Sequence, residues 1–138
     1  MTATFDLTST YLHLGEERAA TQVPVGPDFW QTLDQREDLQ SGRMVMTFEY
    51  GADWEYWEMH PDGDEVVSTL SGRMTLLLET PDGVERVDLA QGQTAVVPRG
   101  TWHTADVSEP CRALFITAGR GTQHRGRRGS PAGGASTG

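Results

Sequence analysis

Hydrophobic and polar residues alternate along most of this chain, in short runs separated by glycine, proline and aspartate. The run Arg43–Tyr50 shows the pattern clearly, because every second residue in it is methionine or aromatic. Successive side chains of a β-strand point to opposite faces, so this alternation places Met44, Met46, Phe48 and Tyr50 on one side. A period of two is typical of strands that bury one face.

Similar segments predict a succession of strands. The predicted strands are Thr10–Leu14, Thr21–Val25, Arg43–Tyr50, Trp54–His60, Glu65–Leu70, Arg73–Glu79, Val84–Leu89, Thr94–Val97, Thr101–Val107 and Arg112–Thr117. The sequence Thr80-Pro81-Asp82-Gly83 between two of them is a strong hairpin signal. Many short strands with turn residues between them predict an all-β sandwich or barrel.

Three parts of the chain differ in residue pattern. Residues 1–41 form an N-terminal extension with two possible edge strands, and Pro27–Leu39 predicts a short helix that begins after an Asp28 cap. Residues 42–118 hold the remaining strands and form the predicted barrel, which is the single folded domain. Residues 119–138 are rich in glycine and arginine, and we expect them to form a flexible, basic, solvated tail.

Charge and composition exclude several classes of function. All 11 basic residues are arginine, and seven of them lie before Gly119 together with all 20 acidic residues, which gives that part a net charge of −13. A part of the chain this acidic repels phosphate backbones. We therefore expect no nucleic-acid partner. No apolar run approaches the roughly 20 residues that span a bilayer, so we expect no membrane partner.

The same composition bears on where the protein works. The N-terminal residues lack the pattern of a signal peptide, and the single cysteine excludes an internal disulfide, so a cytoplasmic location is expected. The lysine-free, arginine- and glycine-rich usage suggests a bacterial genome rich in G and C.

Four ligand-type residues cluster in the pattern between positions 58 and 103. Strand alternation points Glu58 and His60 to the same face, and the Pro61-Asp62-Gly63-Asp64 turn returns the chain so that Glu65 lies beside them. After a second tight turn, His103 comes two residues into the following strand. Two imidazoles and two carboxylates suit one divalent metal ion, Fe, Mn, Zn or Ni.

These segments resemble the two motifs of the cupin superfamily, G-x5-H-x-H-x3-4-E-x6-G and G-x5-P-x-G-x2-H-x3-N. The residues that match are His60, Glu65, Gly72, Gly92, Pro98, Gly100 and His103. The resemblance covers about Gly42–Ala118 and is typical of small single-domain bacterial cupins of the His-Pro-x-Gly-Asp-Glu type. It implies a β-barrel of the double-stranded β-helix (jelly roll) kind, with His60, Glu65 and His103 as metal ligands.

Two positions depart from the cupin motifs. Glu58 stands where the first histidine of H-x-H is found, and Val107 stands where the terminal asparagine is found. A carboxylate can ligate a divalent metal, so Glu58 is either a fourth ligand or the general base of a reaction. The alternative is that the metal has been lost and that the four groups form a polar binding pocket.

Other residues are candidates for binding a substrate. Trp54 and Tyr56 share the face of Glu58 and His60 by alternation, which would let them stack on a flat molecule, although core packing explains them as well. Met46 is a possible pocket wall. The stretch around His124 resembles a Gly-Thr-x-His sequence near the end of some small bacterial cupins. His124 is therefore either a lid or acid–base residue, or an exposed histidine of the tail.

We weigh three functions. The first is a metal-dependent cupin enzyme acting on a small aromatic or flat organic molecule, by dioxygenase-type or cyclase/isomerase-type chemistry. The second is a non-catalytic cupin that binds or senses a small molecule, in which Glu58 pairs with a histidine and no metal is needed. The third, a purely structural module, fits four buried ionisable groups least well. Cupins often dimerise through N-terminal strands, so a homodimer is expected.

Overall fold

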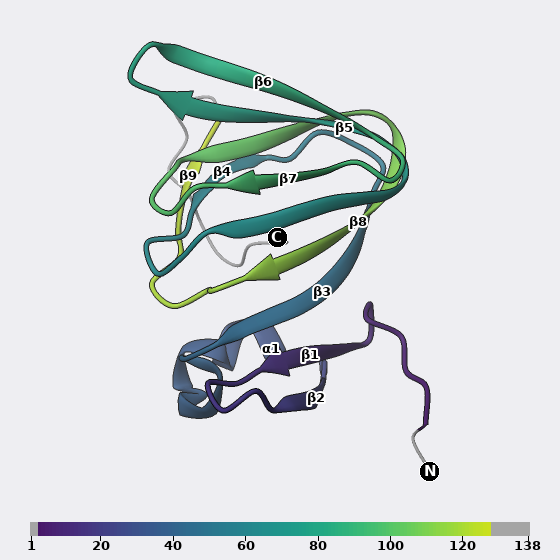
Figure 1. Cartoon of the computed structure of the whole chain (residues 1–138), viewed down its shortest axis with the longest axis vertical. Helices are drawn as coiled ribbons and strands as arrows, with labels where there is room; N and C mark the ends of the chain where they lie inside the picture. The colour runs from purple at the N-terminus through teal and green to yellow at the C-terminus, as the bar shows by residue number, and fades with distance from the viewer. Residues whose placement is uncertain (1–2, 128–138) are drawn as a thin grey trace.

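Strands form most of the regular structure in the computed structural model, which describes residues 3–127 (Figure 1). Their bounds are β1 Thr10–Leu14, β2 Ala20–Pro24, β3 Arg43–Tyr50, β4 Tyr56–Met59, β5 Glu65–Thr80, β6 Gly83–Ala90, β7 Thr94–Val97, β8 His103–Thr117 and β9 Gln123–Gly126. One short α-helix, α1 Phe29–Thr32, precedes two single-turn 3-10 helices, Leu33–Gln35 and Glu37–Leu39. The prediction of an all-β fold is confirmed.

The strands pair in an antiparallel sheet that curls around a hydrophobic core. One path through the sheet runs β2-β1-β3-β8-β4-β9. The first part of β5 lies between β7 and β8, and its second part lies between β6 and β8. Phe115, Met74 and Leu76 are fully buried between these layers. The sheet has an edge at β2, where the expected association of two copies stays a prediction.

The two longest strands differ from the sequence prediction, which divided each of them in two. β5 joins the predicted segments Glu65–Leu70 and Arg73–Glu79, and β8 likewise runs through residues 103–117 without a break. The pairing between β5 and β8 shifts in register between Thr69 and Thr75, which bends both strands. Gly72 lies in this bend with φ +74°, so the strand continues where a turn was expected.

Gly72→Ala is expected to lower the free energy of unfolding by about 2–4 kcal/mol. A Cβ atom at Gly72 would lie 2.0 Å from the Pro110 carbonyl oxygen and 2.8 Å from the Cys111 Cα, so the backbone of β8 would have to move. Both the positive φ and this overpacking contribute to the cost. Urea unfolding measures it, with Gly51→Ala as the control, because nothing lies within 4 Å of a Cβ atom there. Equal stability of the two variants would contradict the close approach.

The N-terminal extension packs against the barrel at β3. β1 has the bounds predicted from the sequence and pairs with β3, and Tyr11 contacts Phe29 edge-on with ring centroids 5.3 Å apart. α1 begins after Asp28, as expected, but the Asp28 side chain forms no capping hydrogen bond. A helix of four residues is too short to be stable alone. We attribute its position to the burial of Phe29 in the common core.

The segment after the last predicted strand differs from the prediction. Residues 123–126, expected in a solvated tail, form strand β9 and pair with β4. The Arg125 guanidinium lies over Trp102, 4.5 Å from the ring centroid, and 5.4 Å from that of Trp57, and it forms an ion pair with Glu79. Cation–π contacts and backbone pairing therefore hold a strand that has no alternating apolar residues. Residues 128–138 of the predicted tail lie outside the described residues.

Arg127 fastens the end of the same strand. Its guanidinium donates to the Trp54 carbonyl oxygen at 3.0 Å and to the Asp106 carboxylate at 2.8 Å.

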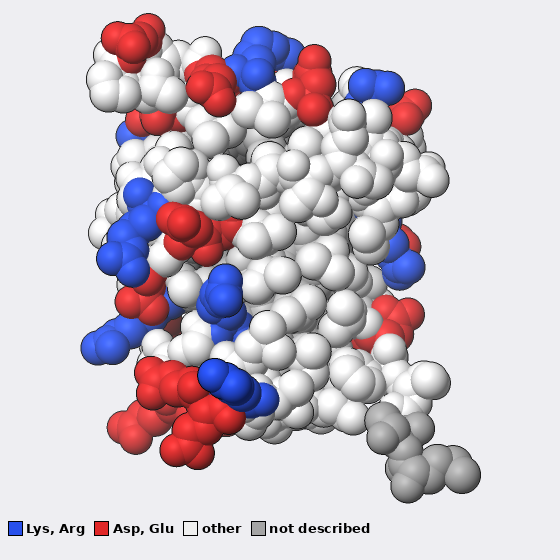
Figure 2. Space-filling model, in the orientation of Figure 1, with Lys and Arg blue, Asp and Glu red and all other residues white. Residues whose placement is uncertain are grey.

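Acidic and basic side chains gather along the edges of the face in Figure 2, and its middle is uncharged. None of the helices within residues 3–127 is long and apolar enough to cross a membrane.

Candidate metal centre

Two turns at one end of the barrel are joined by hydrogen bonds from the second motif to the first. The Gly100 amide donates to the His60 carbonyl oxygen at 2.9 Å. The Arg99 amide donates to the Asp64 carboxylate at 2.7 Å. These bonds hold the turn after β4, which separates His60 from Glu65, against the turn that precedes His103. The four ligand-type residues are therefore brought together by local turn chemistry as well as by the sheet.

Strand register sets the direction of the side chains. Glu58 on β4 lies directly opposite His103 on β8, and residues opposite one another in antiparallel strands share a face. Glu58, His60, Glu65 and His103 are each at most 4% exposed. The sequence prediction that Glu58 and His60 point together is confirmed, although His60 lies just beyond the end of β4.

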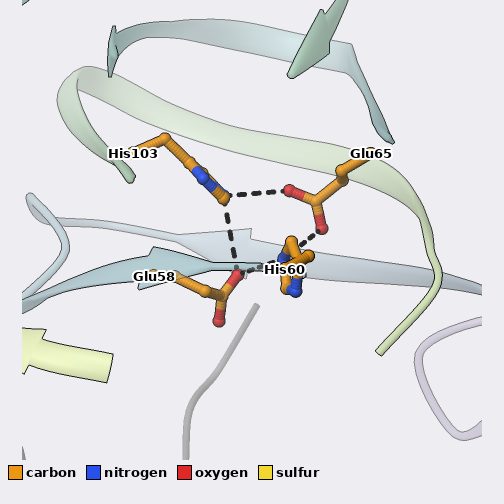
Figure 3. Close-up of side chains that lie close together, drawn as sticks. All are labelled: Glu58, His60, Glu65 and His103. Carbon is orange, nitrogen blue, oxygen red and sulfur yellow. Dashed lines mark ion pairs between the residues drawn. The ribbon is translucent and has the colours of Figure 1, made fainter. Parts of the chain in front are cut away.

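The four side chains point toward one another, as Figure 3 shows. His60 Nε2 lies 3.0 Å from Glu58 Oε1 and 3.1 Å from Glu65 Oε2. His103 Nε2 lies 3.1 Å from Glu65 Oε1 and 3.7 Å from Glu58 Oε1. Ligand atoms about 2.1 Å from one ion lie roughly 3.0–3.5 Å apart at angles between about 90° and 110°. Three of the four distances fall within this range, and the fourth is slightly longer.

Each imidazole is oriented by a hydrogen bond from its other nitrogen. The Thr122 hydroxyl donates its proton to the Gly119 carbonyl oxygen at 2.8 Å, so at 2.7 Å from His60 Nδ1 it must accept. His103 Nδ1 lies 3.0 Å from the Thr101 carbonyl oxygen, which can only accept. Both Nδ1 atoms therefore carry a proton, and both Nε2 atoms face the cluster, as in metal-binding histidines with an outer partner.

The carboxylates also have outer partners. The Thr117 hydroxyl donates to Glu65 Oε2 at 2.6 Å. His124 on β9 lies directly opposite Glu58, and its Nε2 is 3.0 Å from Glu58 Oε2. Glu58 thus has a histidine opposite it on each side, His103 on β8 and His124 on β9.

The atoms that face the centre fit a divalent ion. His60 Nε2, His103 Nε2 and Glu65 Oε1 are buried and have no partner in hydrogen-bond geometry, although they lie at ion-pair distance from one another. Buried polar atoms are seldom left in this state. Two imidazole nitrogens and two carboxylates within 4.8 Å of one another form a donor set for Fe(II), Mn(II), Ni(II) or Zn(II).

The electrostatics of the cluster follow from its burial. Burial alone would lower the pKa of both histidines, but Glu58 and Glu65 outweigh it and raise the pKa of His60 to about 9 and that of His103 to about 10. Burial alone would raise the pKa of Glu58 and Glu65, but the neighbouring histidines hold both below their ordinary value. In the absence of a metal, two imidazolium ions therefore balance two carboxylates at pH 7.

Metal binding at pH 7 is expected to release about two protons, because Nε2 of each histidine must be deprotonated to act as a ligand. Since both pKa values lie above 7, apparent affinity should rise with pH, by up to about 100-fold per unit from pH 6 to 8. Titration calorimetry in PIPES and in MOPS, which differ in ionisation enthalpy, counts the protons. Affinity independent of pH over this range would show that the imidazoles are already neutral.

A cavity of about 460 Å³ lies next to the cluster. The residues lining it are Phe29, Trp30, Leu33, Asp34, Met44, Met46, Glu58, His60, Thr117, Gly119, Gly121, Thr122 and His124. Met46 and His124, two of the predicted substrate-binding residues, are among them. Phe29, Trp30 and Leu33 were not predicted to line the cavity, because their approach to the barrel depends on contacts between distant parts of the chain.

Trp54 and Tyr56, the other two predicted substrate-binding residues, are not among the residues that line this cavity. The Trp54 ring packs on Phe115 and on His103, with centroids 6.0 Å and 6.2 Å away. The Tyr56 carbonyl oxygen accepts a hydrogen bond from Thr104 at 2.8 Å. Trp54 thus packs against the His103 side chain. The aromatic wall of the cavity comes from the N-terminal extension.

Comparison with protein families gives a match to the cupin domain family over residues 44–117, more than half of the chain. No protein among the curated sequences matches this chain. The match covers β3 to β8 and thus contains Glu58, His60, Glu65 and His103. The resemblance inferred from the two motifs is therefore confirmed.

Several solved structures are similar to about half of this chain. One is a cupin-2 domain protein from Shewanella frigidimarina, with 21% identity, TM-score 0.47, and coverage of 54% of this chain and 69% of that chain. Another is hydroquinone 1,2-dioxygenase from Sphingomonas sp. TTNP3, with 17% identity, TM-score 0.46, and coverage of 54% and 59%. A third is hydroxypropylphosphonic acid epoxidase from S. wedmorenis, with 12% identity, TM-score 0.48, and coverage of 54% and 42%.

Proposed function

This chain belongs to the cupin domain family, and on that premise we propose that it is a metal-dependent enzyme acting on a small organic molecule. One observation carries the proposal: His60 Nε2, His103 Nε2 and Glu65 Oε1 face one buried point, at ion-pair distance but outside hydrogen-bond geometry. That point borders a cavity whose volume of about 460 Å³ is typical of small-molecule sites.

His60, Glu65, His103 and Glu58 would hold one divalent ion, Fe, Mn, Zn or Ni. Such an ion supplies Lewis acidity for cyclase- or isomerase-type chemistry, or a redox centre for dioxygenase-type chemistry. The apolar residues of the cavity exclude water from a bound molecule and orient it against the cluster. Glu58 and His124 both line the cavity and lie at hydrogen-bond distance from each other. This pair can therefore take a proton from the bound molecule or return it.

One observation favours the second candidate, a metal-free binding or sensing protein. The two histidines and two glutamates balance in charge without an ion, because the pKa values of His60 and His103 are raised to about 9 and about 10. Ion pairs of this kind would make the pocket polar and stable. Against this candidate stand the Nε2 atoms of both histidines, which lie at ion-pair distance and yet lack hydrogen-bond geometry.

Turnover distinguishes the two candidates. Protein loaded anaerobically with Fe(II), Mn(II), Ni(II) or Zn(II) is incubated with a panel of phenols and enolisable ketones, while dioxygen uptake and product mass are followed. The proposal expects conversion of at least one compound by the loaded protein and none by the His60→Ala/His103→Ala variant. Compounds that bind but are never converted by any loaded form would support the non-catalytic alternative.

A further inference from the structure

The residues that line the cavity beside the four-residue cluster are of two kinds. The polar ones include Glu58, His60 and His124, with the threonines Thr117 and Thr122. The apolar ones are Phe29, Trp30 and Leu33 of the N-terminal extension, with Met44 and Met46 of β3. A molecule that contacts both kinds has an oxygen-bearing group on a flat or compact apolar body.

Packing fixes the aromatic part of the wall. Trp30 meets Phe29 edge-on with ring centroids 5.1 Å apart, and it also contacts Tyr11 and Phe48 with centroids 5.9 Å and 6.0 Å away. A ring held on several sides keeps its orientation, and its remaining face suits an aromatic molecule or a cation. Met44 and Met46 can adjust to the outline of that molecule.

The charges that line the cavity are acidic. Asp34 is exposed, lines the cavity, and has no ion-pair partner among residues 3–127. No arginine among residues 3–127 lines the cavity. Arg43 and Arg120 flank lining residues in the sequence without lining the cavity themselves, and Arg36 and Arg125 are engaged with Asp38 and Glu79. A divalent ion would neutralise Glu58 and Glu65 and leave Asp34 as the uncompensated charge. A carboxylated or phosphorylated molecule would find no guanidinium among the described residues that line the cavity.

We propose that this cavity selects a neutral or singly cationic phenol-like molecule, with its hydroxyl at the cluster and its amine or other basic group toward Asp34. The proposal rests on the proposed function, because it assigns the substrate class of the same site. Trp30 stacks on the ring, and Asp34 distinguishes cationic molecules from anionic ones.

Three compounds with the same ring and different terminal charge test this selection. Tyramine is a cation at pH 7, 4-ethylphenol is neutral, and 4-hydroxyphenylacetate is an anion. Titration calorimetry on the full chain, metal-free and metal-loaded, is expected to show tyramine binding about 10-fold more tightly than 4-hydroxyphenylacetate, with 4-ethylphenol between them. Tighter binding of the anion, or no binding of any of the three, would overturn the proposal.

Asp34→Asn is the variant that isolates the charge. It is expected to bring the affinities of tyramine and 4-ethylphenol to within about twofold of each other, while that of 4-ethylphenol is unchanged. Asp82→Asn in the exposed β5–β6 turn makes the same change in net charge away from the cavity and should preserve the wild-type order. An equal effect of the two variants on tyramine would show that only the overall charge matters.

Metal content measured on the same samples separates this inference from the proposed function. If the metal binds but the charge order is absent, the substrate class is wrong and the metal centre stands. If the charge order is present in protein that binds no metal, the metalloenzyme proposal fails and the cavity's selectivity stands.

Discussion

His103→Ala is expected to lower metal affinity by about 100- to 1000-fold. Four ligands together give a metal-binding free energy of about 10–16 kcal/mol, and removing one of them should lose roughly a quarter of it. The same variant should destabilise the metal-free protein. Glu58 and Glu65 then share His60 as the remaining histidine of the cluster, and breaking a buried ion pair costs about 3–5 kcal/mol. Competition with a chelator of known affinity measures the first effect, and urea unfolding measures the second.

His13→Ala is the matched control for this variant. His13 is also buried, and its Nε2 forms a 2.7 Å hydrogen bond with the Ser41 carbonyl oxygen. It does not belong to the cluster of Glu58, His60, Glu65 and His103. Its loss should lower stability and preserve metal affinity. If the two alanine variants bind the metal equally well, His103 is not a ligand.

The double variant Thr122→Val/His124→Leu is expected to weaken metal binding by about 100- to 10,000-fold without removing a ligand. Outer hydrogen-bond partners of metal ligands each contribute about 10- to 100-fold in affinity, and these two act on different ligands, His60 and Glu58. Each single variant should give about 10- to 100-fold by the same reasoning. Metal competition measures all three.

The surface threonine Thr94 supplies the control for Thr122→Val. Its hydroxyl pairs with that of Ser68 at 2.8 Å, and it lies at the opposite end of β7 from Val97, the residue that pairs with Glu65. Thr94→Val should therefore leave metal affinity unchanged. Wild-type affinity in the double variant would mean that β9 only covers the barrel and does not position its ligands.

The clustering of Glu58, His60, Glu65 and His103 could be predicted from the sequence because local rules govern it. Alternation along one strand pairs Glu58 with His60, and short turns place Glu65 and His103 after them. The structure brings these four residues to one buried point. The same rules predicted β1, β3 and β7 with their observed bounds, since each is a short run with clear flanking signals.

The remaining features depend on contacts between distant residues. Strand β9 has no alternating apolar residues, and Arg125 over Trp102 is a contact that periodicity does not reveal. Phe29 and Trp30 were expected to belong to a separate extension, yet they form the aromatic wall of the cavity. The continuity of β5 depends on the close approach of Gly72 to Cys111, which also joins separate strands.

Metal content tests the central claim most directly. Protein purified without a histidine tag or chelator, and then reconstituted anaerobically with each candidate ion, is analysed by mass spectrometry beside the His60→Ala/His103→Ala variant. The account predicts close to one ion per chain in the wild type and none in the variant. Wild-type protein that retains no Fe, Mn, Ni or Zn after reconstitution would contradict it.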